Sequence, residues 1–190
     1  MFHFRRHFLQ RSRYFSSTTP DILTDAWFRP VGEGALLIRF GTEICVETNT
    51  KVLDCMHILD TTSNSLFGVQ QILPAYASLL IHYDPTLLGS TEVEQWCRKE
   101  ASDQDNASNL EQLKKKPPRC ISIPVQYGGE YGPDLNEAAT IANLNSPKDV
   151  CDIHSSGNYR VYFLGFTGGF PYMGGLPKEL TSVPRLSTPR

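Results

Sequence analysis

A short stretch between residues 165 and 175 combines five glycines with aromatic side chains. Glycine allows positive φ and close backbone approach, and aromatic rings supply flat apolar walls. Such a loop lines a pocket and presents backbone N–H groups to a carbonyl or phosphate oxygen. Its spacing differs from the P-loop motif, and the alternative is a tight bend in which these residues only pack. The residues predicted to bind substrate or nucleotide are Gly168, Gly169, Phe170, Tyr172, Gly174 and Gly175.

Two further side chains are candidates for catalysis, although no step is assigned to either, and the catalytic residues stay unknown. His154 follows Cys151 by three positions, but no other residues have complementary spacing, so no metal site is predicted. The imidazole suits acid–base or hydrogen-bonding chemistry, or it stabilises the end of a helix. Arg160 suits a bidentate grip on a carboxylate, or it lies on the solvated face of a sheet.

The first half of the chain has the pattern of a small α+β sandwich. Strands are predicted at residues 35–40, 69–73 and 78–83. One helix carries Val52, Met56 and Leu59 on one face, and a second buries Val93, Trp96, Cys97 and Ala101. The order β-α-β-β-α predicts helices packed on one face of a sheet.

A polar segment, residues 102–118, is predicted to be an exposed linker because it is poor in apolar residues and ends in two prolines. The second unit, residues 119–190, is predicted to be mostly β. Residues 121–127 alternate apolar and polar side chains, and residues 159–166 form a strand. Short helices begin after Asp134 and at Ser146-Pro147.

Composition excludes several classes of protein. Lys and Arg number 18 against 20 Asp and Glu, so the net charge of −2 does not favour a nucleic-acid partner. No apolar run is long enough for a membrane span. The five cysteines form no CxxC pair, which favours free thiols in a reducing compartment.

The first twenty residues have a composition unlike the rest of the chain. They hold Arg5, Arg6, Arg11 and Arg13, several hydroxyl residues and no acidic residue, with phenylalanines recurring along one helical side. This composition is typical of a mitochondrial transit peptide and predicts the mitochondrial matrix as the location. The alternative is a basic tail on a cytoplasmic protein.

Several segments together resemble one family. They include residues 32–41, 74–85 and 123–135, the longer stretch 154–177, and the final Thr188-Pro-Arg190. In register over residues 28–190, the chain resembles the allophanate hydrolase subunit 1 type of carboxyltransferase domain, the family that includes the B subunit of ATP-dependent 5-oxoprolinase. The resemblance implies an N-terminal α+β domain at residues 28–101 and a cyclophilin-like β-barrel at residues 119–190.

The resemblance also implies an activity and partners. The expected function is that of one component of an ATP-dependent hydrolase that opens 5-oxoproline, a lactam, to glutamate. The expected partners are a C-type carboxyltransferase half and an A-type lactam hydrolase, with ATP acting in the complex. Two alternatives remain. One is a carboxyltransferase acting on urea or allophanate, with biotin carried by another polypeptide, and the other is a non-catalytic module like a bacterial histidine kinase inhibitor.

The chain departs from the family pattern in two places. Gly168 stands where the family usually has proline, which loosens the loop by about 0.4–1 kcal/mol through the entropy of the unfolded chain. Family members also continue for some tens of residues beyond the position of Arg190. We therefore expect a C-terminally truncated barrel, whose open edges leave the pocket incomplete.

Overall fold

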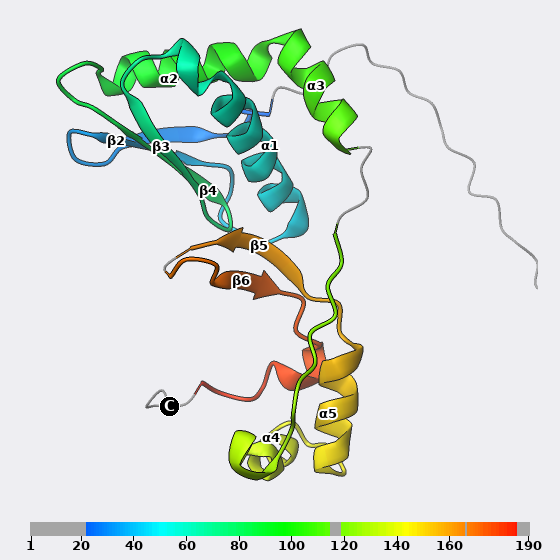
Figure 1. Ribbon diagram of the computed structural model, residues 1–190. Helices are drawn as coiled ribbons and strands as arrows, with labels where there is room; N and C mark the ends of the chain where they lie inside the picture. The colour runs from blue at the N-terminus through cyan, green and yellow to red at the C-terminus, as the bar shows by residue number, and fades with distance from the viewer. Residues whose placement is uncertain (1–21, 115–118, 166, 186–190) are drawn as a thin grey trace, which may run out of the picture.

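The computed structural model describes residues 22–114, 119–165 and 167–185 (Figure 1). The predicted transit peptide, residues 1–20, and the C-terminal Thr188-Pro-Arg190 lie outside the described residues. The elements of the first part are β1 (Trp27–Pro30), β2 (Ala35–Arg39), α1 (Val46–Thr62), η1 (Ser63–Ser65), β3 (Val69–Pro74), β4 (Ser78–Tyr83), α2 (Ser90–Ser102) and α3 (Gln104–Lys114). Those of the second part are η2 (Gly129–Tyr131), α4 (Leu135–Ile141), α5 (Pro147–Ser156), β5 (Arg160–Leu164), β6 (Pro171–Gly174) and η3 (Lys178–Leu180).

The first part is an antiparallel sheet with the strand order β1-β2-β4-β3. The predicted order β-α-β-β-α is confirmed by β2, α1, β3, β4 and α2. The edge strand β1 was not predicted, because its four residues are mostly exposed and give no apolar alternation. The mixed α and β architecture expected from the sequence is therefore present.

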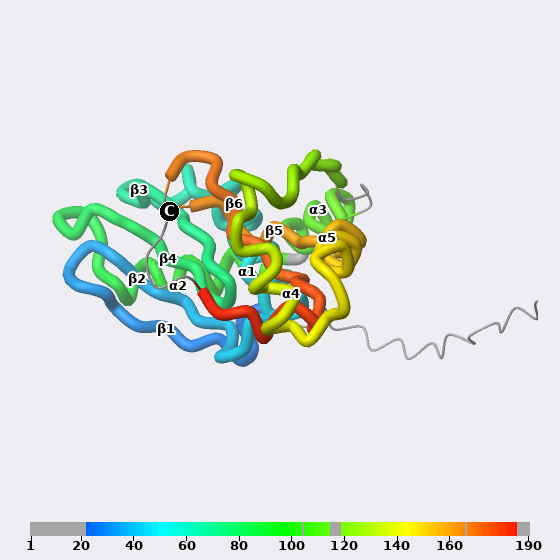
Figure 2. Tube along the Cα trace, turned by 90° about the horizontal axis from the view of Figure 1, so that it is seen from below, coloured from blue at the N-terminus to red at the C-terminus, as the bar shows by residue number. Residues whose placement is uncertain are grey.

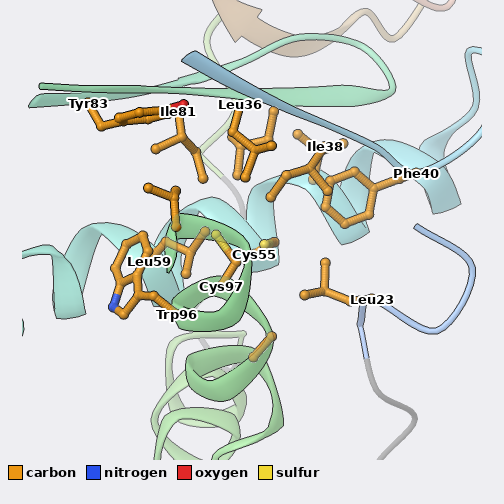
Figure 3. Close-up of a cluster of buried hydrophobic side chains, with 14 of the residues drawn as sticks. Leu23, Leu36, Ile38, Phe40, Cys55, Leu59, Ile81, Tyr83, Trp96 and Cys97 are labelled. Carbon is orange, nitrogen blue, oxygen red and sulfur yellow. The ribbon is translucent and has the colours of Figure 1, made fainter. Parts of the chain in front are cut away.

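The main core lies between this sheet and helices α1 and α2 (Figure 3). Alternate residues of β4 are buried, since successive side chains of a strand point to opposite faces. Leu79 and Ile81 are fully buried, and Leu59 of α1 and Cys97 of α2 meet this face from the helices. The predicted buried face of the second helix, Val93, Trp96, Cys97 and Ala101, is confirmed.

The segment expected to be an exposed linker differs in the structure, because helix α3 occupies most of it. Leu110 is only 7% exposed. Lys114, in the last turn of α3, forms an ion pair with Asp54 of α1, with 2.8 Å between Nζ and the carboxylate. One buried leucine and this ion pair thus hold a mostly polar helix against α1, and the Asn106 amide donates to the Glu100 carbonyl of α2 at 3.1 Å. A low average hydropathy does not reveal such individual contacts.

The second part contains a helical cluster and a two-stranded ribbon, β5–β6 (Figures 1 and 2). The helices α4 and α5 pack with η3 around Ala139, Val150 and Leu180. The helix predicted at Ser146-Pro147 is confirmed. The Ser146 hydroxyl accepts from the Asp149 N–H, and the Asp149 carboxylate accepts from the Ser146 N–H.

Two expectations for the second part differ from the structure. Residues 121–127 form no strand, and Ile121, Ile123 and Val125 are 64%, 70% and 53% exposed. The predicted strand is wrong for this structure because no neighbouring strand is present among the described residues to pair with it. The described residues also contain no closed barrel, so the cyclophilin-like prediction is not confirmed.

None of the helices in the described ranges combines the length and the apolar character needed to cross a lipid bilayer.

Candidate functional site

The glycine-rich stretch forms the turn and second strand of the β5–β6 ribbon. Leu164 pairs with Pro171 at the turn end, and Arg160 pairs with Gly174 at the opposite end. The Gly165 N–H donates to the Phe170 carbonyl at 3.1 Å and closes the turn. The stretch predicted as one loop is therefore a turn followed by a strand, and its predicted binding residues lie at both ends of the ribbon.

Gly174 and Gly175 serve close packing at the end of the ribbon that holds Arg160. A Cβ on Gly174 would lie 2.7 Å from the Tyr162 ring. A Cβ on Gly175 would lie 2.6 Å from the Asn158 carbonyl oxygen, and the φ of Gly175 is +103°. Both positions therefore require glycine for internal reasons, and the packing explanation accounts for them without a ligand.

Gly168 and Gly169 have open space around them. A Cβ on either glycine would meet no heavy atom of the described residues within 4 Å, and the φ of Gly169 is +81°. Beside them lies an open cavity of about 280 Å³, which we name the turn cavity. It is lined by Leu164, Gly165, Thr167, Gly168 and Gly169. Of the predicted binding glycines, these two remain available to a ligand.

The aromatic residues of the stretch, like its glycines, divide into packed and exposed positions. Tyr172 stacks on Phe163 at a ring distance of 4.4 Å and lies 6.2 Å from Tyr76, which precedes β4. Tyr172 therefore helps to hold the ribbon against the first part. Phe170 is 53% exposed, and its ring centroid lies 5.4 Å from that of Tyr172 at an interplanar angle of 69°. Phe166 lies outside the described residues.

His154 lies between two tyrosines near the end of α5. The Tyr127 hydroxyl is 2.7 Å from His154 Nδ1. The Tyr159 hydroxyl donates to the His154 backbone carbonyl at 2.8 Å, and its ring lies 5.2 Å from the imidazole. Burial, followed by the neighbouring Tyr127, raises the pKa of Tyr159, so its hydroxyl stays protonated as a donor.

Arg160 is exposed at the start of β5, six positions after His154. The turn cavity begins four residues further along β5, which corresponds to about 13 Å at the rise of a strand. The structure thus divides the predicted site. Its His154 end contains Arg160, Gly174 and Gly175, and its turn end contains Gly168, Gly169 and Phe170. No three His, Cys, Asp or Glu side chains in the described part of the chain are placed to hold a metal ion.

Some residues at the site were not singled out by sequence reasoning. Tyr127 was predicted only as a strand position, and Tyr76 and Asn49 were given no role. The Asn49 amide, fully buried in α1, shares its Nδ2 donors among the carbonyls of Ala75, Tyr76 and Tyr162 at 3.3–3.4 Å. The only local signal in the sequence that could have drawn attention to Tyr127 is the Gly128-Gly129 pair that follows it. In the structure these glycines have φ angles of +76° and +59° and turn the chain.

Comparison with known proteins places the chain among named relatives. It is 35% identical over 166 residues to the B subunit of 5-oxoprolinase from Bacillus subtilis, and the match covers 84% of this chain and 67% of the relative. It is 53% identical over 72 residues to the corresponding protein of Escherichia coli O157:H7, and this match covers 38% of this chain and 32% of the relative.

A solved structure has a similar fold. The crystal structure of TTHA0988 in space group P212121 superposes with a TM-score of 0.63 at 30% identity, over 82% of this chain and 28% of that one. Residues 26–190 match the family described as carboxyltransferase domain, subdomain C and D. This match covers far more than half of the sequence, and the chain therefore belongs to the carboxyltransferase domain family, subdomains C and D.

Proposed function

We propose that this chain is the B-type component of an ATP-dependent 5-oxoprolinase, which opens the lactam 5-oxoproline to glutamate. The observation that carries this proposal is the 35% identity with the B subunit of Bacillus subtilis 5-oxoprolinase over 84% of the chain. The name of that relative favours a lactam over a urea-like substrate. The proposed partners are a C-type carboxyltransferase half and an A-type lactam hydrolase.

The chemistry explains why several proteins are needed. Resonance stabilises the lactam amide, and phosphorylation of its carbonyl oxygen by ATP makes ring opening feasible. In this chain we assign substrate binding to the turn cavity, where the backbone N–H groups of Gly168 and Gly169 and the Thr167 hydroxyl are suitable donors to a carbonyl or carboxylate. A volume of about 280 Å³ suits a ligand smaller than a typical drug.

The turn cavity does not fit the triphosphate of ATP by itself. Its lining includes no lysine or arginine among the described residues, and its glycines lack the spacing of a P-loop. We therefore derive no step through ATP on this chain and assign nucleotide binding to the assembled complex.

The exposed side of the ribbon supports a shared site. Val161, Leu164 and Met173 are 46%, 61% and 46% exposed, and exposed apolar side chains that gather on one face are typical of an interaction surface. In the proposed assembly, β5 and β6 are two strands of a cyclophilin-like barrel that further strands complete, and the turn cavity is closed by the C-type partner.

Reconstitution tests this proposal. The chain is mixed with the C-type and A-type proteins of the same organism, and ATP-dependent release of glutamate from 5-oxoproline is measured against the two partners alone. We expect glutamate only when all three proteins and ATP are present. The proposal is rejected if the complete mixture releases no more glutamate than the partners without this chain.

A bulky substitution locates the site within the chain. Gly168→Leu extends a side chain into open space, so the variant should unfold at the same urea concentration as the unaltered chain. We expect it to lower the rate of glutamate release about tenfold or more, because it occupies the turn cavity. The matched control is Asn64→Leu, which adds the same side chain at an exposed position of the first part and should keep the rate. Equal rates for both variants would remove the turn cavity from the proposal.

A further inference from the structure

The contact between Tyr127 and His154 has a consequence for which nitrogen of the imidazole carries the proton. The two side chains are 27 positions apart in the sequence, yet the phenol oxygen and Nδ1 are only 2.7 Å apart. Among the described residues, the hydrogen bond of the His154 ring is the one with Tyr127. We propose that Tyr127 donates to Nδ1 and thereby holds His154 as the neutral tautomer with its proton on Nε2.

The direction of this hydrogen bond follows from the donor and acceptor properties of the two groups. A neutral imidazole has one N–H donor and one bare nitrogen acceptor. The bare nitrogen is a strong acceptor, whereas the oxygen of a phenol is a weak one because its lone pair is delocalised into the ring. The arrangement O–H···N is therefore favoured over N–H···O, and the bond at Nδ1 determines that the proton is on Nε2.

The backbone turns sharply directly after Tyr127. Gly128 and Gly129 adopt left-handed φ angles directly after it, and a Cβ on Gly132 would lie 2.9 Å from the Gly128 nitrogen. The chain therefore folds back tightly at the point where Tyr127 leaves it. The Tyr127 ring stands at 81° to the imidazole, with centroids 5.8 Å apart.

Tyr159 restrains His154 from another side without touching its ring nitrogens. Its hydroxyl binds the His154 backbone carbonyl, and its ring lies at 44° to the imidazole. A Cβ on Gly157 would lie 3.0 Å from the Tyr159 ring, so a side chain there would displace the ring by a few tenths of an ångström. The two tyrosines thus have separate effects: Tyr127 sets the tautomer of the ring, and Tyr159 holds the His154 backbone.

The consequence is that the N–H donor of the ring is on Nε2. A carbonyl or carboxylate oxygen is the acceptor that matches this donor. Tyr127 is in this view a positioning residue that acts through His154. The tautomer itself depends only on the contact within this chain.

Nuclear magnetic resonance on the chain alone tests the tautomer. The full chain is labelled with ¹⁵N in its five histidines, and the His154 signals are assigned by their loss in His154→Asn. Spectra are recorded on the alkaline side of the measured titration of the His154 signals, where the ring is neutral. We expect one fixed pattern, with Nε2 protonated and Nδ1 bare. A protonated Nδ1 in the unaltered chain would overturn the inference without any variant.

Two matched variants separate the tyrosines. Tyr127→Phe removes the hydroxyl at Nδ1 and keeps the ring, and we expect the fixed pattern to be lost in favour of a mixture of both tautomers. Tyr159→Phe removes an equally close hydroxyl that binds only the backbone, and the fixed pattern should persist. An unchanged pattern in Tyr127→Phe overturns the inference. Because the spectra need neither partner nor ATP, this result is independent of whether glutamate is released in the reconstitution.

Discussion

At the residue scale, the glycines of the β5–β6 ribbon have different tasks. Gly175→Ala forces a side chain into left-handed backbone and against the Asn158 carbonyl. We expect it to lower the free energy of unfolding by at least about 1 kcal/mol. Gly168→Ala meets open space and should change it by less than about 0.5 kcal/mol. Urea denaturation of both variants, fitted with a common m-value, checks the contrast. Equal losses of unfolding free energy in the two variants would contradict the division of the glycines into packed and open positions.

At the same scale, residue type and spacing predicted only one partner of each important contact. His154 and the glycine-rich stretch stand out by their chemistry, but Tyr127 lies 27 positions before His154 and Tyr76 lies 97 positions before Met173, whose carbonyl accepts from its hydroxyl. A local sequence pattern contains no information on contacts between residues so far apart in the sequence. The split of the glycines into packing and open positions likewise depends on Asn158 and Tyr162, which only the folded chain brings close.

At the scale of elements, α3 shows how a few contacts decide whether a polar segment folds. Although burial lowers the pKa of Lys114, the hydrogen bond and charge of Asp54 together with Glu111 raise it overall. We expect Lys114→Met to lower the free energy of unfolding by about 0.5 kcal/mol, the size of a partly exposed ion pair. Lys51→Met, an exposed lysine of α1, is the control and should have no effect.

The pH dependence of this ion pair has a definite sign. Because the pKa of Lys114 is higher in the folded than in the unfolded chain, its stabilising effect is complete below the ordinary lysine pKa of about 10.4. The effect is lost as the pH rises through the folded-state pKa. The stability difference between the unaltered chain and Lys114→Met should therefore stay constant up to about pH 10 and shrink at higher pH in urea denaturation. A difference that grows over this range would contradict the raised pKa.

The elements β2, α1, β3, β4 and α2 of the first part could be predicted because their patterns are satisfied within the chain. The buried alternation of β4 faces helices α1 and α2, which carry matching apolar faces. Residues 121–127 have an equally regular alternation, yet they form no strand and residues 121–126 are exposed. A period of two specifies which side chains share a face, but a strand also needs a hydrogen-bonding neighbour, and the sequence pattern contains no information on whether one is present.

At the scale of the whole molecule, we propose that the first twenty residues direct the protein to the mitochondrial matrix. The prediction rests on their arginines and on the absence of acidic residues. A fusion of residues 1–30 to a fluorescent protein should enter mitochondria in a manner that requires the membrane potential. Replacing Arg5, Arg6, Arg11 and Arg13 with glutamine should leave the fusion in the cytoplasm, whereas replacing Ser16, Ser17, Thr18 and Thr19 with alanine should preserve import. Import of the glutamine variant would contradict a charge-driven signal.

The two parts of the molecule are joined at a seam of few polar bonds and several aromatic rings. Asn49 donates from α1 to carbonyls on both sides of this seam, and Tyr76 packs 5.1 Å from both Tyr162 and Phe163. The Asn49 Oδ1 is buried without a partner among the described residues, so the side chain is held by its donor end alone.

We expect Asn49→Ala to lower the free energy of unfolding by about 2–3 kcal/mol, because it leaves a void and takes a donor from three carbonyls. The exposed Asn64→Ala is the control. If the seam is what joins the parts, Asn49→Ala should also broaden the ring signals of Tyr162 and Tyr172 while those of Tyr83, in the core of the first part, stay sharp. A loss of stability that leaves all three rings unchanged would mean that Asn49 stabilises α1 alone, and that the aromatic contacts hold the ribbon without it.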